Sequence, residues 1–237
     1  MLYIFCMSKA TVVVFLILFA TPIWASELTH AIDNLEGEWA KVYYQNDESL
    51  QRKAYPALID KAAELGKRFP RAAEPKIWQA TIIATNAEFQ SSLDALASLR
   101  AAKGLLEEAI ALQPEALDGA AYVTLGTLYY MAPGWPISFG DNQLAEQMLK
   151  ASLKINPNGI DANYFYADYL LQQDRSAEAE EYLRKAVQAP LRKNQYFADS
   201  QLQNEAKLAL TNTQQRKSNT GKNKFQAIFT TATYSAD

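Results

Sequence analysis

Apolar residues recur at helical spacing along most of the chain, and three segments share one order. In each, a small residue is followed four positions later by an aliphatic one, three positions later by a second small one, and then by another aliphatic residue. A proline ends each segment, and the segments span residues 101–114, 144–157 and 178–190. Small residues let helices approach closely, and proline cannot continue a helical hydrogen-bond ladder. The pattern predicts helices that pair into stacked hairpins.

Partner helices precede two of these segments, at residues 120–130 and 161–171. The first of them places aromatic, aliphatic and small residues on one face: Tyr122, Leu125, Gly126 and Tyr129. Residues 31–70 keep only the helical period, and they predict a first hairpin in which Leu35, Trp39 and Val42 share a stripe. Terminal repeats often depart from the common pattern because they cap the stack.

Helix ends and a last helix can also be predicted. Asp141, Asp161 and Ser176 each stand where a side chain would cap the start of a helix. Beyond Pro190, the sequence predicts a closing helix whose inward-facing residues are Phe197, Leu202 and Leu208.

These motifs carry a resemblance. The small–aliphatic–small order before a proline, and the spacing of Tyr122, Leu125, Gly126 and Tyr129, resemble the two helices of a tetratricopeptide repeat. The resemblance implies an all-α, right-handed superhelix of about four helical hairpins plus a C-terminal closing helix.

A narrower resemblance rests on residues 117–173, above all on "PGWPISFGD" and "DANYFYA". This stretch is similar to the periplasmic T component (TatT) of TRAP-type transporters. That similarity implies a helical periplasmic protein that binds a solute-binding protein, a ligand or both, and that can oligomerise. The chain departs from this family because it has no cysteine after its N-terminal apolar run.

The connection at residues 131–141 is rich in proline, glycine and aromatic residues. Its apolar side chains, Trp135, Ile137 and Phe139, allow two compatible interpretations. In one, they fold onto their own hairpin as a plug. In the other, they reach a partner or line a pocket between repeats.

A second candidate site lies on the predicted first helices. Tyr130, Tyr164 and Asp168 fall where such helices line the concave groove of a repeat stack, and groove aromatics suit peptide or ligand contacts. The positions of a carboxylate clamp hold other residue types, which argues against capture of a C-terminal carboxylate. Those residues are Ala120, Val123, Asp161 and Tyr164.

The first 25 residues have the pattern of a secretory signal peptide, with Lys9 before an apolar run at residues 11–24. We expect cleavage after Ala25, with an uncleaved anchor as the alternative and Met7 as a second possible start. The run is shorter than the roughly 20 residues of a spanning helix. The only cysteine, Cys6, lies inside this segment, so the mature chain would have no thiol. The expected location is the periplasm.

Composition excludes several function classes. The formal net charge of −3 gives no basic footprint for nucleic acid. His30 is the only histidine, and no motif of a nucleophile elbow, phosphate-binding loop or zinc protease occurs in the sequence. We therefore expect no catalysis, no cofactor and no metal site.

The sequence thus predicts three parts: a signal peptide at residues 1–25, a repeat domain at 26–214 and a mostly disordered tail at 215–237. The expected function is that of an exported binding scaffold, with an accessory role beside a periplasmic solute-binding protein or transporter. The alternative is an envelope assembly factor anchored at the inner membrane by an uncleaved signal. Expected partners are another periplasmic or envelope protein or a small apolar ligand, with homo-oligomers as a further option and membrane contact only if the signal stays attached.

Overall fold

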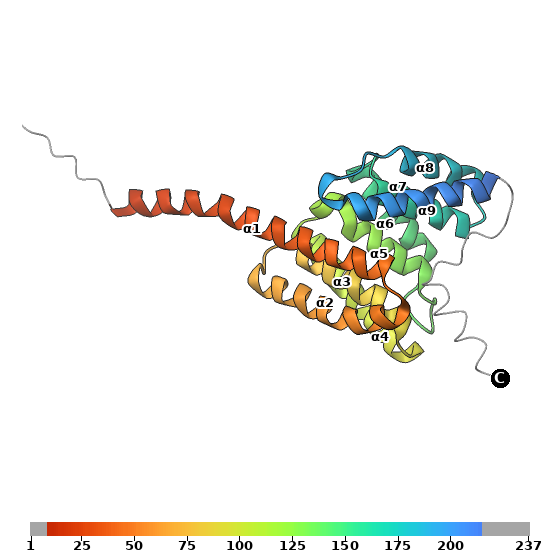
Figure 1. Cartoon of the computed structure of the whole chain (residues 1–237), viewed down its shortest axis with the longest axis horizontal. Helices are drawn as coiled ribbons and strands as arrows, with labels where there is room; N and C mark the ends of the chain where they lie inside the picture. The colour runs from red at the N-terminus through yellow and green to blue at the C-terminus, as the bar shows by residue number, and fades with distance from the viewer. Residues whose placement is uncertain (1–8, 215–237) are drawn as a thin grey trace, which may run out of the picture.

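Consecutive helices pair into hairpins along the chain (Figure 1). The computed structural model describes residues 9–214, with side chains from residue 26 to residue 213. Within that part the α-helices are α1 (Lys9–Gln45), α2 (Glu48–Arg68), α3 (Glu74–Asn86), α4 (Ser92–Leu112), α5 (Ala120–Met131), α6 (Asn142–Ile155), α7 (Ile160–Gln172), α8 (Ser176–Gln188) and α9 (Tyr196–Gln214). Three short 3₁₀ turns lie between them: η1 (Ala87–Phe89), η2 (Ala116–Gly119) and η3 (Lys193–Gln195).

The predicted fold class is confirmed. Helices α1 to α8 form four successive hairpins, each packed on the next, and α9 closes the array against α8. The described residues contain no strand, and together they form an all-α repeat superhelix.

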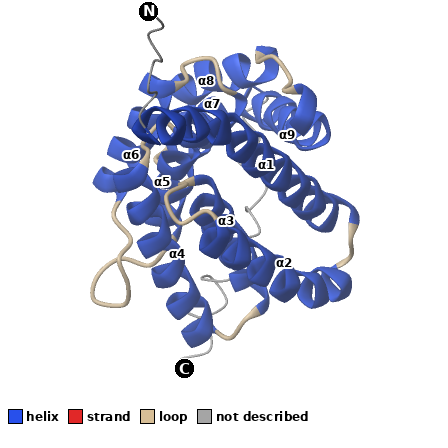
Figure 2. Cartoon of the chain, turned by 90° about the vertical axis from the view of Figure 1, so that its left-hand side faces the viewer, coloured by secondary structure: helices blue, strands red, loops and turns tan. Residues whose placement is uncertain are grey.

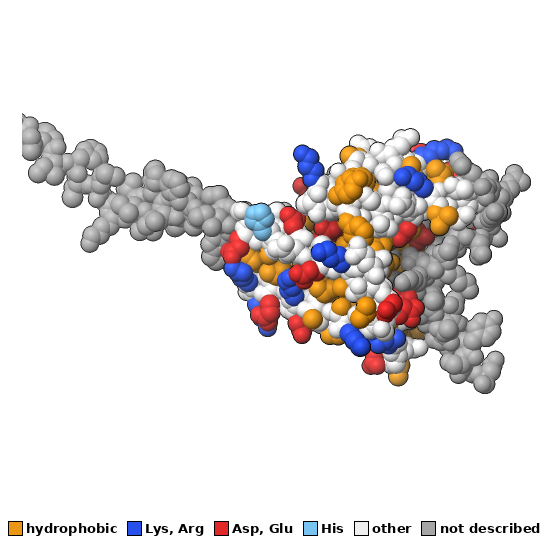
Figure 3. Space-filling view, in the orientation of Figure 1, with side chains coloured by type: hydrophobic (Ala, Val, Ile, Leu, Met, Phe, Trp, Pro, Cys, Tyr) orange, Lys and Arg blue, Asp and Glu red, His pale blue; other side chains and the backbone are white. Residues whose placement is uncertain are grey.

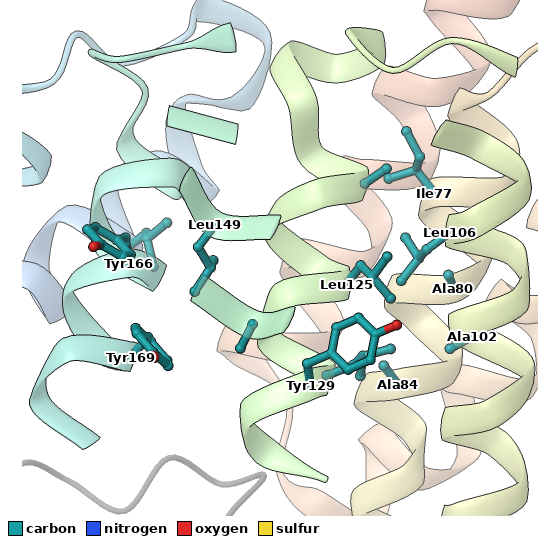
Figure 4. Close-up of a cluster of buried hydrophobic side chains, with 14 of the residues drawn as sticks. Ile77, Ala80, Ala84, Ala102, Leu106, Leu125, Tyr129, Leu149, Tyr166 and Tyr169 are labelled. Carbon is teal, nitrogen blue, oxygen red and sulfur yellow. The ribbon is translucent and has the colours of Figure 1, made fainter. Parts of the chain in front are cut away.

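The small–aliphatic–small order forms the core that it predicts. In α4, α6 and α8 the central leucines are fully buried, as are the small residues on either side of each: Ala102, Leu106, Ala109, Ala145, Leu149, Ser152, Ala179, Leu183 and Ala186. Figure 4 shows Leu125 and Tyr129 of α5 facing Ala102 and Leu106 of α4. One core runs from α3 to α9, and a second joins α1, α2 and α3.

Of the predicted helix caps, one is confirmed. The Asp141 side chain accepts hydrogen bonds from the backbone N–H groups of Gln143 and Leu144, at 2.8 and 3.0 Å, and so caps α6. Asp161 and Ser176 were predicted as caps, and both predictions are wrong. Each residue lies inside its helix. The cap positions are taken by Gly159 before α7 and by Arg175 before α8, and neither residue forms a side-chain capping hydrogen bond.

The closing helix α9 differs from the sequence prediction at one of its three inward-facing residues. Leu202 is buried and Phe197 is half-buried, as predicted, but Leu208 is 62% exposed. Leu202 and Ala206 are one helical turn apart and share a buried face of α9, whereas Leu208 lies on another side of that helix. Because α9 is the last helix, that side has no neighbour among the described elements.

The two ends of the array meet. Helix α1 lies beside α9 in both views of the chain (Figure 2), and it also contacts η3. Asn194 donates a hydrogen bond from Nδ2 to Oδ1 of Asp33 at 2.8 Å, and the Tyr44 and Phe197 rings meet edge to face at 6.0 Å. The stack is therefore closed across its concave side.

Two predicted segments lie largely beyond these observations. The first half of α1 covers most of the predicted signal peptide and extends away from the repeats (Figure 1), but residues 1–8 are outside the described part, as is the predicted tail at 215–237. In the described part of the chain, no helix combines the length and apolar character that crossing a membrane requires.

Candidate functional site

The loop between α5 and α6 has a fixed backbone. The Gly140 N–H donates to the Pro133 carbonyl at 2.9 Å, and the Asp141 N–H donates to the Tyr129 carbonyl at 2.9 Å. A Cβ atom on Gly140 would come within 2.0 Å of the Ala132 carbonyl oxygen, so this crossing of the loop needs glycine. The Trp135–Pro136 peptide bond is cis.

The side chains of this loop divide into two groups. Phe139 is half-buried and meets the Tyr129 ring edge to face at 5.9 Å, so it packs on its own hairpin. Trp135 is 89% exposed and Ile137 is 58% exposed. The plug interpretation is therefore wrong for Trp135 and Ile137, which present an apolar tip to the surroundings.

The concave side of the array holds a cavity of about 210 Å³, here called the central cavity. Helices α1, α3, α5, α7 and α9 contribute its walls. Six aromatic side chains line it: Trp39, Tyr43, Tyr44, Trp78, Tyr164 and Phe165. The residues at the carboxylate-clamp positions, Ala120, Val123, Asp161 and Tyr164, also line it, whereas the predicted groove residues Tyr130 and Asp168 do not.

The aromatic wall is ordered by contacts between α1 and α3. The Trp39 and Trp78 rings lie 5.5 Å apart, and Trp39 donates a hydrogen bond from Nε1 to Oγ1 of Thr85 at 3.3 Å. Trp39 also stacks on Tyr43, with ring centroids 5.1 Å apart. The Trp78 Nε1 atom is buried without a hydrogen-bond partner among the described residues.

The three groove residues predicted from the sequence lie in different settings. The Tyr164 side chain lines the central cavity and donates from its hydroxyl to Oε2 of Glu205 at 3.1 Å. The Tyr130 hydroxyl donates to Oδ2 of Asp168 at 2.7 Å, which links α5 to α7. Burial, reinforced by the Asp168 charge, holds the pKa of Tyr130 well above its ordinary value. Tyr130 and Asp168 thus form one half-buried hydrogen-bonded pair.

A charged cluster stands at the end of the cavity near α9. The Arg192 guanidinium is paired with Oδ1 of Asp199 and with Oδ2 of Asp161, the latter at 2.9 Å. The Arg192 backbone N–H also donates to Oδ2 of Asp199 at 2.7 Å. Asp161 is therefore bound to Arg192 rather than to the start of α7. Burial raises the pKa of Asp161 above its ordinary value, while the Arg192 charge opposes that rise.

Glu36 of α1 completes the cluster. Its side chain is only 2% exposed, it lines the cavity, and its Oε2 atom has no hydrogen-bond partner among the residues described. Burial raises the pKa of Glu36 to about 8. The charges of Asp199, Asp33 and Asp161 add to that rise, and the Arg192 charge opposes it. Glu36 is therefore mostly protonated at neutral pH.

Sequence reasoning missed this cluster, although one signal for it exists. Glu36, Trp39 and Tyr43 have the i, i+3, i+7 spacing of one helix face, which adjoins the face of Leu35. Arg192 and Asp199 lie more than 150 positions further on, and only the closure of the array brings them to Glu36.

The remaining candidate polar side chains of the described residues lie at the surface. His30 is exposed at the surface (Figure 3), and Glu107, Glu108, Glu180 and Glu181 each pair with a neighbouring Lys or Arg on that surface. Among the described residues, no group of three or more His, Cys, Asp or Glu side chains could hold a metal ion.

Comparison with known proteins supports the repeat assignment. Residues 137–196, which span α6, α7 and α8, match the tetratricopeptide repeat family. This match supports the tetratricopeptide superfamily, whose repeats commonly mediate contacts between proteins, and hence supports a protein partner in general. No curated protein matches the chain.

Proposed function

We propose that this chain is an exported, non-catalytic scaffold that binds an envelope protein through the loop between α5 and α6. The observation that carries the proposal is Trp135, which stands 89% exposed at the tip of a loop with a fixed backbone. Tryptophan is enriched among the residues that dominate binding energies, because it buries a large area at low entropic cost. A rigid loop also loses little conformational freedom on binding.

The kind of partner follows from the narrower resemblance. The stretch at residues 117–173 includes this loop and resembles the T component of TRAP-type transporters. A solute-binding protein or transporter subunit in the periplasm is the partner that this resemblance favours. A second copy of the chain is the other occupant that the loop could accept.

The experiment is photo-crosslinking in cells with a light-reactive residue in place of Ile137, which is 58% exposed beside Trp135. We expect one discrete adduct, identified by mass spectrometry as an envelope protein. The Trp135→Ala variant should reduce this adduct at least tenfold without lowering the melting temperature, since the side chain makes little contact with its own fold.

The matched control is Leu93, an 81% exposed leucine in the first turn of α4 and outside the loop. A probe at Leu93 should not yield the same adduct, and Leu93→Ala should not weaken it. An adduct that survives Trp135→Ala, or no adduct at Ile137, would overturn the proposed contact. An adduct between two copies of the chain would show that the loop forms a homo-oligomer contact instead of binding a different protein.

One observation favours the anchored alternative. Helix α1 runs without a break from Lys9 to Gln45, so the apolar segment at residues 11–24 continues directly into the first hairpin. Cell fractionation with sequencing of the N-terminus distinguishes the exported, cleaved form from the anchored, uncleaved form. A soluble periplasmic chain that begins at Ser26 supports export with cleavage, whereas a membrane-bound chain that retains Lys9 supports an envelope assembly factor held by its signal.

A further inference from the structure

We propose that the central cavity is a binding site for a small organic cation, an ammonium group on an apolar body, with Glu36 as its counter-ion. This site is separate from the loop around Trp135 and adds a second function to the scaffold. The proposal stands on the volume of the cavity, its aromatic walls, its excess of carboxyl groups and the orphaned oxygen of Glu36.

The walls suit a cation with an apolar body. Trp39 and Trp78 stand together on one side of the cavity, and Tyr164 and Phe165 of α7 also line it. Aromatic faces carry negative potential and attract ammonium groups, most strongly where water is excluded. The volume of about 210 Å³ suits a small molecule rather than an extended peptide.

The charges in the cavity favour a cation over an anion. The lining residues include four carboxyl groups, Glu36, Asp161, Asp199 and Glu205, and one basic side chain, Arg192. Arg192 is already paired with Asp161 and Asp199, so few of its N–H groups remain to bind an incoming anion. The lining carboxylates would in addition repel an anion, because like charges raise each other's electrostatic energy.

Glu36 supplies the specific contact. Its Oε2 atom is buried and without a partner in the described structure, although a buried polar atom normally forms a hydrogen bond. The charged groups that face Glu36 are Asp33 on its own helix, Asp161 of α7, Asp199 of α9 and Arg192 before η3. An ammonium N–H that donates to Oε2 would satisfy this atom and balance the acidic excess.

Cation binding is therefore coupled to a proton. The free cavity holds Glu36 in its neutral form at pH 7, since burial raises its pKa to about 8. A bound ammonium favours the carboxylate, so the Glu36 proton leaves to solvent as the cation enters. The affinity for the cation should rise as the pH increases from 6 to 8, because less work is then needed to ionise Glu36.

The test uses three probes of nearly the same shape: benzylamine, benzyl alcohol and benzoate. Calorimetric titration of the purified full chain should show benzylamine binding at least tenfold more tightly than either of the others at pH 7.5. Titration in two buffers of different ionisation enthalpy should count between one half and one proton released per benzylamine bound.

The variant pair is Glu36→Gln and Glu38→Gln. Glu38 lies on the same helix but is exposed and paired with Lys61, so it controls for the loss of a carboxylate on α1. We expect Glu36→Gln to lower the affinity for benzylamine at least tenfold and to abolish proton release on binding. Glu38→Gln should change neither the affinity nor the proton release.

The probe series tests the proposal even if the variant fails to fold. Equal affinity for benzylamine and benzyl alcohol would make the cavity a general apolar site and overturn the proposal. Tightest binding of benzoate, or binding of none of the three, would overturn it as well. Because Trp135 lies outside this cavity, the result is independent of the crosslinking experiment on the loop.

Discussion

At the residue scale, Glu36 is a buried carboxyl group that is costly to ionise. A carboxyl group that loses its hydration without gaining a hydrogen-bond donor resists ionisation, and burial raises its pKa to about 8. The fold tolerates Glu36 at neutral pH because the group is then mostly protonated. Its ionisation is therefore coupled to stability.

We predict that this coupling appears in the pH dependence of unfolding. The pKa of Glu36 is about 8 in the folded chain and close to 4.5 in the unfolded chain. Between these values the folded state holds a proton that the unfolded state has lost, so stability falls as the pH rises from about 5 to 8. The slope from one such group is at most about 1.4 kcal/mol per pH unit.

Urea unfolding of the wild type, Glu36→Gln and Glu38→Gln at several pH values measures this slope. Glu36→Gln should remove the decline that Glu36 causes, and it should be more stable than the wild type at pH 8. Glu38→Gln should follow the wild type. Parallel curves for all three chains would mean that Glu36 ionises normally in the folded state.

At the element scale, the closeness of α5 and α6 depends on one missing side chain. A Cβ atom on Gly126 would lie 2.7 Å from Cγ of Leu149 and 3.2 Å from the carbonyl oxygen of Ala145. Both neighbours are fully buried in the core, so neither can move away freely. The hairpin therefore requires glycine at this position.

We predict that Gly126→Ala lowers the free energy of unfolding by about 1–3 kcal/mol, the usual cost of overpacking a core. Gly104→Ala is the matched control, because Gly104 is also inside a helix but has no atom within 4 Å of an added Cβ. That change should stabilise the chain by about 0.5–1 kcal/mol, since alanine favours helix more than glycine does. Equal effects of the two changes in thermal unfolding would contradict the close packing of α5 on α6.

The same elements show what the sequence could predict. The burial of Ala102, Leu106 and Ala109 results from contacts within one hairpin and with its neighbour. A local sequence pattern is therefore enough to predict it. The cap prediction at Asp161 failed for the opposite reason. Asp161 is drawn to Arg192, 31 positions away, and short-range preferences carry no information on that partner.

At the scale of the whole molecule, closure distinguishes this array from a linear repeat stack. In a linear stack each repeat contacts only its neighbours, so stability is nearly a sum of local terms. Here α1 also contacts α9 and η3, which lie more than 140 positions further along the chain. Since these contacts enclose the central cavity, its cluster of Glu36, Asp199 and Arg192 could not be predicted from repeat patterns.

We predict that weakening this contact loosens both ends together. The double variant Asn194→Ala with Phe197→Ala removes the hydrogen bond to Asp33 and the ring contact with Tyr44. Amide hydrogen exchange should then accelerate at least tenfold in α1 from residue 28 to residue 45, as well as in α9. The buried interior of α4 and α6 should keep its protection, because its contacts are within and between central hairpins.

The control is Lys193→Ala with Tyr196→Ala, which alters two exposed side chains of the same segment. This pair should leave exchange in α1 unchanged, since neither side chain is buried at the contact. Faster exchange in α9 alone after the first double variant would show that α2 and α3 hold α1 in place. The contact between α1 and α9 would then contribute little to the stability of α1. Faster exchange in both would show that the two ends of the array form one cooperative unit. In that case occupancy of the cavity they share should protect both, because a ligand that binds only the closed form stabilises every contact that forms it.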